Sequence, residues 1–119
     1  MYPSPRILYW EGSARNDFKR FPLPVQKDMG VALFAVQLGG TPGSAKRWKG
    51  LGPGIYQLAE RYRGDAFRAV YLLLKDDSVH VLHAFRKKSK SGVSTPPRDV
   101  ALVEMRFKAV LARHRKGGG

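Results

Sequence analysis

The chain has 119 residues, no cysteine, and 22 lysines and arginines against nine acids, for a formal net charge of +13. The length suits one domain with one core, and a hydrophobic fraction of 43% argues against overall disorder. The lack of cysteine excludes disulfides and thiolate metal sites. The three histidines lack metal-ligand spacing, so no metal and no other cofactor is expected. Without a signal peptide or a membrane-length apolar run, we expect a soluble, cytoplasmic protein with no membrane partner.

The N-terminal third predicts one strand and two helices. Residues 6–10 are rich in aliphatic and aromatic side chains, which is typical of a short strand. Ser13 can cap a helix over 14–21, and Pro22 and Pro24 suit the opening of a second helix. That helix carries an apolar stripe at helical spacing and ends at Gly39-Gly40. The stripe consists of Val25, Met29, Ala32, Leu33 and Val36.

The rest of the chain predicts a loop, three strands and a final helix. Glycine and proline keep 41–54 irregular, and strands follow over 55–63, 66–74 and 79–87. Gly64-Asp65 and residues 75–78 are suitable hairpin turns. A last helix over 98–113 follows Pro96-Pro97, and Val100, Val103, Phe107, Val110 and Leu111 form its apolar face. The order β-α-α-β-β-β-α indicates an α+β fold, an antiparallel sheet packed by two N-terminal helices and a C-terminal helix. We expect a single domain over 1–116 and a flexible tail over 117–119.

The positive charge is concentrated in two segments. Arg86 to Lys116 holds ten basic residues and two acids, and Lys46 to Arg68 holds six basic residues and two acids. A focused positive patch attracts polyanions and steers their approach. The composition therefore predicts a nucleic-acid partner. Within the patch, we expect RNA contacts from Lys46, Arg47, Trp48, Lys49, Phe85, Arg86, Lys88 and Lys90.

Hairpin pairing predicts a cluster of cations at one end of the sheet. A tight turn at Gly64-Asp65 would place Arg61 directly opposite Arg68, and a tight second turn would place Arg68 opposite Phe85. Side chains alternate between faces along a strand, so one face would gather Arg61, Arg68, His83, Phe85 and Lys87. Two facing arginines favour an anion between them. The alternative is that Arg61 points to solvent or pairs with a nearby acid.

Three aromatic or titratable residues permit two interpretations each. His83 alternates with apolar residues, so it is either a packed, hydrogen-bonded histidine or a group for proton transfer. Phe85 could stack on an unpaired base or belong to the core. Trp48 could offer a second stacking platform or anchor its basic loop.

Four short motifs resemble the phage-related, RelE/HigB-like toxins of bacterial toxin–antitoxin modules. They are Lys49-Gly-Leu-Gly-Pro-Gly-Ile-Tyr56, Glu60-Arg61, Phe67-Arg68-Ala-Val-Tyr71, and Val81-Leu-His-Ala-Phe-Arg-Lys-Lys88 before Pro96. The resemblance covers roughly residues 8–113 and implies a RelE-like fold. It also implies a ribosome-dependent endoribonuclease that cleaves mRNA without a metal, by attack of the 2′-hydroxyl on the adjacent phosphate.

The resemblance assigns roles to individual residues. Arg68 matches the family arginine that would bind the phosphate, and Lys87 and Lys88 match the basic motif that would hold phosphate or supply a proton. Glu60 and Arg61 match a motif of the phage-related branch, and we include them with His83 among the catalytic candidates. Better-known members carry lysines where this chain has Gln57 and Ala59. If one of those lysines is the general base, then Glu60, His83 or Lys49 would have to replace it.

The implied partners are a cognate antitoxin with a helix-turn-helix domain, mRNA and ribosomal RNA. Two other interpretations remain. The basic surface could belong to a non-catalytic RNA-binding module, or to a toxin that acts by binding another target such as DNA gyrase. A phage structural component is a third, and the concentrated charge makes it less attractive.

Overall fold

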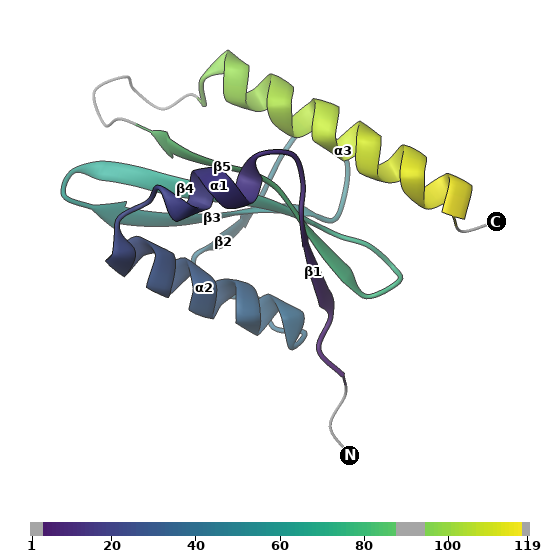
Figure 1. Cartoon of the computed structure of the whole chain (residues 1–119), viewed down its shortest axis with the longest axis horizontal. Coiled ribbons are helices and arrows are strands. Elements are labelled where there is room, and N and C mark those ends of the chain that lie inside the picture. The colour runs from purple at the N-terminus through teal and green to yellow at the C-terminus, as the bar shows by residue number, and fades with distance from the viewer. Residues whose placement is uncertain (1–3, 88–94, 118–119) are drawn as a thin grey trace.

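A mixed five-stranded sheet with helices on both faces forms the structure (Figure 1). It is a computed structural model that describes residues 4–87 and 95–117. The strand order is β1-β5-β4-β3-β2. The elements are β1 (Ile7–Trp10), α1 (Ala14–Lys19), α2 (Leu23–Gln37), β2 (Ala45–Arg47), β3 (Ile55–Tyr62), β4 (Asp65–Leu73), β5 (Ser78–Lys87) and α3 (Pro97–Gly117). The α+β class is confirmed.

Two features of the sheet differ from the sequence prediction. The segment expected to be a loop contains β2, which pairs with β3 although it is only three residues long. The sheet is also not fully antiparallel, because β1 pairs with β5 in the parallel direction. The connection from β1 to β5 spans the rest of the sheet, so local hairpin signals could not reveal this pairing.

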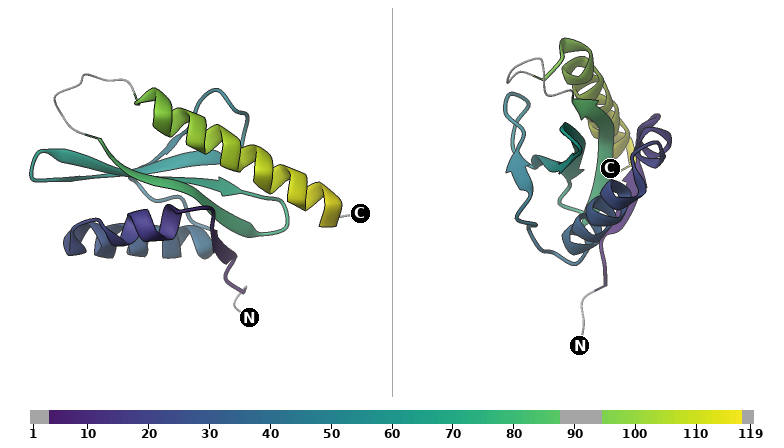
Figure 2. Two further views of the ribbon diagram at one scale, coloured as in Figure 1. Left: turned by 45° about the horizontal axis from the view of Figure 1, so that its top comes forward. Right: turned by 90° about the vertical axis from the view of Figure 1, so that its left-hand side faces the viewer.

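The helices enclose the sheet from opposite sides (Figure 2). Helices α1 and α2 lie against one face, and the predicted apolar stripe of α2 is buried along its whole length. Helix α3 crosses the other face, where Val103 and Val110 pack against Val70 and Phe85. Val100, expected on the same apolar face, is 39% exposed. No helix in the described part of the chain has the length and apolar character needed to cross a membrane.

The β3–β4 turn sits one residue earlier than predicted. The turn residues are Arg63 and Gly64, with φ angles of 51° and 87°. A type I′ hairpin turn requires positive φ at both central positions, and glycine adopts it without a steric penalty. The pairing of Arg61 with Arg68 was therefore wrong: Arg61 faces Ala66, and Arg68 faces Ala59. The partner of each β3 residue on β4 thus differs by two positions from the prediction. Because side chains alternate between faces with a period of two, both arginines remain on the predicted face.

The β4–β5 pairing begins as predicted and changes in the middle of the strands. Arg68 lies opposite Phe85, and Val70 lies opposite His83. An irregularity follows Val70, and the next pair is Tyr71 with Val81. A bulge of this kind changes the local twist without altering the pairs on one side of it. The end of the sheet that carries Arg68 keeps the expected register.

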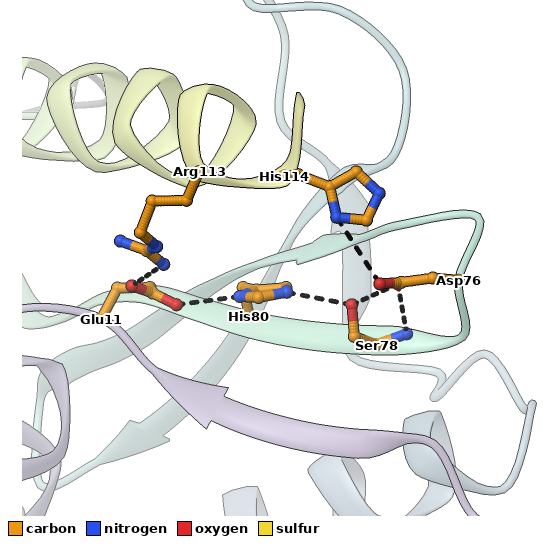
Figure 3. Close-up of polar contacts among 6 residues, drawn as sticks. All are labelled: Glu11, Asp76, Ser78, His80, Arg113 and His114. Carbon is orange, nitrogen blue, oxygen red and sulfur yellow. Dashed lines mark hydrogen bonds and ion pairs between the residues drawn. The ribbon is translucent and has the colours of Figure 1, made fainter. Parts of the chain in front are cut away.

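A polar network around the buried residues Glu11, Ser78 and His80 fastens the sheet to the C-terminal part of α3 (Figure 3). Glu11 accepts hydrogen bonds from His80 Nδ1 at 2.8 Å and from Arg113 Nη2 at 2.7 Å. Burial alone would raise the pKa of Glu11, but the hydrogen bonds from His80 and Arg113 outweigh burial and leave the pKa below its ordinary value. Glu11 thus joins β5 to α3 as an ionised carboxylate.

The same network continues to the β4–β5 turn. His80 Nε2 lies 3.0 Å from Ser78 Oγ, which donates to Asp76 Oδ1 at 2.5 Å. His114 of α3 reaches the other oxygen of Asp76 at 3.5 Å. The hydrogen bond from Ser78 lowers the pKa of Asp76. Two carboxylates, one at each end of the network, therefore hold the C-terminal part of α3 (Figure 3).

Removing the Glu11 carboxylate should loosen α3 in a pH-dependent way. We expect Glu11→Gln to lower the free energy of unfolding at pH 7 by about 1–3 kcal/mol, because the buried His80 loses a charged acceptor. A carboxylate with a lowered pKa stabilises the fold above its unfolded pKa, and this stabilisation is lost as the pH falls through the folded pKa. The difference from wild type should therefore shrink below pH 4.5, the ordinary pKa of Glu11.

Urea unfolding at pH 7 and at low pH measures this difference. The matched control is Glu104→Gln, since the ion pair of Glu104 with Lys108 is largely exposed. That variant should lie within about 0.5 kcal/mol of wild type at both pH values. Equal destabilisation by Glu11→Gln at both pH values would contradict the assigned role of the carboxylate.

Candidate active site

Arg68 occupies the middle of the sheet face that α3 partly covers. Its neighbours across the strands are Ala59 of β3 and Phe85 of β5. Its Nη1 donates a hydrogen bond of 2.6 Å to Gln57 Oε1. Its Nε is buried and has no hydrogen-bond partner in the described part of the chain. A buried donor without an acceptor is uncommon in folded proteins and calls for a physical reason.

The charge of Arg68 is not neutralised by any described carboxylate. Arg86 pairs with Asp65 at 2.8 Å and Arg113 pairs with Glu11 at 2.7 Å, but Arg68 has no salt bridge among the described residues. Gln57 orients the guanidinium with a neutral amide oxygen, which leaves the positive charge in place. A half-buried guanidinium of this kind is suited to an external anion, because its fork can bind two phosphate oxygens.

Two further cations flank the same end of β4. Arg61 of β3 and Lys87 of β5 both lie opposite Ala66, on either side of it, and Arg68 is two residues further along. With strands about 4.8 Å apart, this places the three cationic residues around one small area. Arg61 is exposed, whereas Lys87 is 7% exposed. The predicted grouping of Arg61, Arg68 and Lys87 on one face is confirmed, and their chemical roles stay predictions.

His83 lies beside this group but is engaged in structural contacts. Its Nε2 is 2.7 Å from Asp99 Oδ1, and its Nδ1 is 3.2 Å from Arg106 Nη1. The ring stacks on Phe85 at a centroid distance of 5.1 Å, and Phe85 belongs to the core under α3. Because both ring nitrogens have partners, the geometry favours the packed interpretation of His83. It also favours the core interpretation of Phe85.

Glu60 and Arg86 point to the opposite face of the sheet. Both are paired with Phe67, which packs with Phe21 and Val25 of the α2 side. Arg86 leaves the sheet at the same end as Arg68 but is held by Asp65. Alternate residues of β5 face opposite ways, so Arg86 does not lie on the face of Arg68, and the RNA contact expected of Arg86 stays a prediction. Lys88 and Lys90 lie outside the described residues.

The basic segment 46–49 lies beside the site rather than within it. Lys46 is opposite Gln57 in the β2–β3 pair, and Arg47 is opposite Tyr56. Both are exposed, as is Lys49, and none has a salt bridge among the described side chains. Trp48 is only 7% exposed and packs in the core with Ile55 and Val70. The structure therefore favours the anchoring interpretation of Trp48.

Sequence reasoning missed the contribution of Gln57. It was noted only as a position where relatives carry lysine, yet it is the residue that orients Arg68. The signal that could have found it is the turn: a turn at Arg63-Gly64 brings Arg68 opposite Ala59, two residue pairs from Gln57 and on the same face of the sheet. Asp99 and Arg106, which fix His83 from α3, had no sequence signal because the helix crossing is set by tertiary packing.

The comparisons with known proteins agree with this architecture. Residues 16–108 match the family described as Phage derived protein Gp49-like (DUF891). No curated protein matches the chain significantly.

Three solved structures share the fold at low sequence identity. A mutant of the E. coli toxin RelE in the free state aligns with a TM-score of 0.63 and 15% identity, over 87% of this chain and 98% of that chain. The isolated E. coli RelE toxin gives 0.57 and 16%, over 84% and 97%. The RelBE2 toxin–antitoxin complex of Mycobacterium tuberculosis gives 0.50 and 16%, over 72% and 94%. The chain therefore belongs to the phage-derived Gp49-like family and has the fold of the RelE toxins.

Proposed function

We infer that this protein is the toxin of a RelE-type toxin–antitoxin module and that it cleaves mRNA on the ribosome. Arg68 is the observation that carries the proposal: a half-buried guanidinium, oriented by Gln57, with an unpartnered Nε and no salt bridge to a described acid. Family membership and the RelE fold support the assignment. The partners we propose are a cognate antitoxin, mRNA and ribosomal RNA.

The proposed reaction needs charge stabilisation and proton transfer. The 2′-oxygen of one nucleotide attacks the adjacent phosphorus, and the bond from phosphorus to the 5′-oxygen breaks. The products are a cyclic phosphate and a free 5′-hydroxyl. Arg68 would bind the phosphate oxygens as their negative charge grows, with Arg61 and Lys87 at the flanks. Lys87 would also protonate the departing 5′-oxygen.

The proton of the attacking 2′-hydroxyl needs a separate acceptor. Glu60 lies on the opposite face of the sheet, and both ring nitrogens of His83 have partners. Of the three candidates, Lys49 is the one on an open surface near Gln57. We therefore propose Lys49 or a ribosomal group as the acceptor.

One observation favours a non-catalytic alternative. The strand positions at which better-known relatives carry lysines are Gln57 and Ala59, so the face around Arg68 has fewer titratable groups. A toxin that only binds its target, whether RNA or another target such as DNA gyrase, would need the basic surface but no proton acceptor. The two functions can be distinguished because only the endoribonuclease produces cleaved mRNA.

Substitution of Arg68 tests the proposed chemistry. Arg68→Ala should reduce ribosome-dependent mRNA cleavage, measured by primer extension in a translation reaction, by about 100-fold or more, because a preorganised charge at the phosphate is lost. Arg68→Lys should also be impaired, since an ammonium cannot reproduce the planar fork. The free energy of unfolding of Arg68→Ala should stay within about 1 kcal/mol of wild type.

Arg15→Ala is the matched control, because Arg15 lies exposed on α1 on the other side of the sheet. It should cleave like wild type. Intact messenger with active ribosomes and wild-type toxin would contradict the proposal and leave the binding-only alternative.

Lys46, the exposed lysine of β2, should strengthen RNA binding through its charge without taking part in the cleavage reaction. Lys46→Ala should weaken RNA binding uniformly across sequences and reduce the slope of log affinity against log salt by up to about one unit. Fluorescence anisotropy with labelled single-stranded RNA at several salt concentrations measures this slope. An unchanged slope would show that Lys46 contacts no phosphate.

A further inference from the structure

A cavity of about 670 Å³ lies between the β2 segment and the N-terminal part of α3. It opens on the same face of the sheet as Arg68, and its floor contains Gln57. The residues on which its chemistry depends are Lys46, Trp48, Leu51, Gln57, Val100 and Glu104. A volume of this size is in the range that holds a small organic ligand.

The walls of the cavity are partly apolar and belong in part to the core. Trp48 lines the cavity and is packed into the core, and Leu51 packs against the same core cluster. Val100 stands in the apolar stripe of α3 but is 39% exposed, because it borders the cavity instead of the sheet. A flat apolar group would gain contact with these walls.

The cavity also offers hydrogen-bonding groups of both kinds. Gln57 uses its carbonyl oxygen for Arg68, so its amide nitrogen is a donor without a partner among the described residues. The Glu104 carboxylate, 3.0 Å from Lys108 Nζ, is an acceptor. A carboxylate repels phosphate, which makes the interior of the cavity unsuitable for the RNA backbone. The exposed lysines and arginine of 46–49 at its rim are suited to that backbone.

We propose that this cavity receives one unpaired base of single-stranded RNA, next to the phosphate that binds Arg68. A base has flat apolar faces and an edge of donors and acceptors, which matches the walls and the polar groups described. Gln57 links the two parts of this site: its oxygen accepts the hydrogen bond that orients the Arg68 guanidinium, and its amide nitrogen is available to the base. The inference rests on the proposed function, because Arg68 is taken as the phosphate site.

Nucleotide binding can be measured without the ribosome, which separates this inference from mRNA cleavage. The chain has two tryptophans, so a Trp10→Phe background leaves Trp48 as the fluorescent reporter. We expect the four nucleoside 5′-monophosphates to change Trp48 fluorescence with saturation, and ribose 5-phosphate to have no such effect. Val100→Phe should fill the cavity and weaken nucleotide binding about tenfold, the scale of one lost base contact.

The control Val31→Phe makes the same substitution at an exposed position of α2, which is 67% exposed, and should bind like the background protein. An equal response to ribose 5-phosphate, or no response to any nucleotide, would overturn the inference. If the parent protein binds no nucleotide and Val100→Phe loses antitoxin binding, the cavity belongs to the antitoxin interface. That result would also overturn the inference. Nucleotide binding by a protein that leaves messenger intact would refute the cleavage proposal alone.

Discussion

The register of β3, β4 and β5 is the constraint on which the rest of the site depends. A slip of one residue would turn Arg68 away from α3 and place Phe67 on its face. The left-handed turn at Arg63-Gly64 fixes the first pairing, and the regular half of the β4–β5 pair fixes the second. Together they place Arg68 between Ala59 and Phe85. The side chain of Ala59 is small and the ring of Phe85 is flat, so both leave space for the guanidinium.

The enclosed charge of Arg68 has a cost that the fold offsets elsewhere. A guanidinium with an unpartnered nitrogen is unfavourable, and the one hydrogen bond that Arg68 donates to the neutral amide oxygen of Gln57 compensates for only part of this. Helix α3, which covers this face, is held by the apolar residues Val103 and Val110 and by polar contacts at both ends. Asp99 meets His83 near its N-terminus, and Arg113 meets Glu11 near its C-terminus. These contacts of α3 therefore offset the cost of the unpartnered nitrogen of Arg68.

Local patterns in the sequence predicted most of the elements and the face of each key residue. The apolar stripe of α2 and the alternation along β5 placed their residues correctly, because burial enforces both periods. The patterns did not predict β2, the parallel β1–β5 pair or the contacts of His83 with Asp99 and Arg106. The last two depend on segments that are distant in sequence, whereas β2 is only three residues long and lies in a segment rich in glycine and proline. The turn position was missed because Gly64 can occupy either central position of a two-residue turn.

The central claim is that the Arg68 guanidinium binds a phosphate group of RNA. NMR of the Arg68 Nε–H resonance, assigned by its absence in Arg68→Lys, tests it directly when a short single-stranded RNA with blocked 2′-hydroxyls is added. We predict that this resonance shifts, because a phosphate bound by the Nη atoms changes the charge distribution of the whole guanidinium, of which the buried Nε is part. An unchanged Arg68 resonance, while signals from the 46–49 segment report that the RNA is bound, would contradict the account.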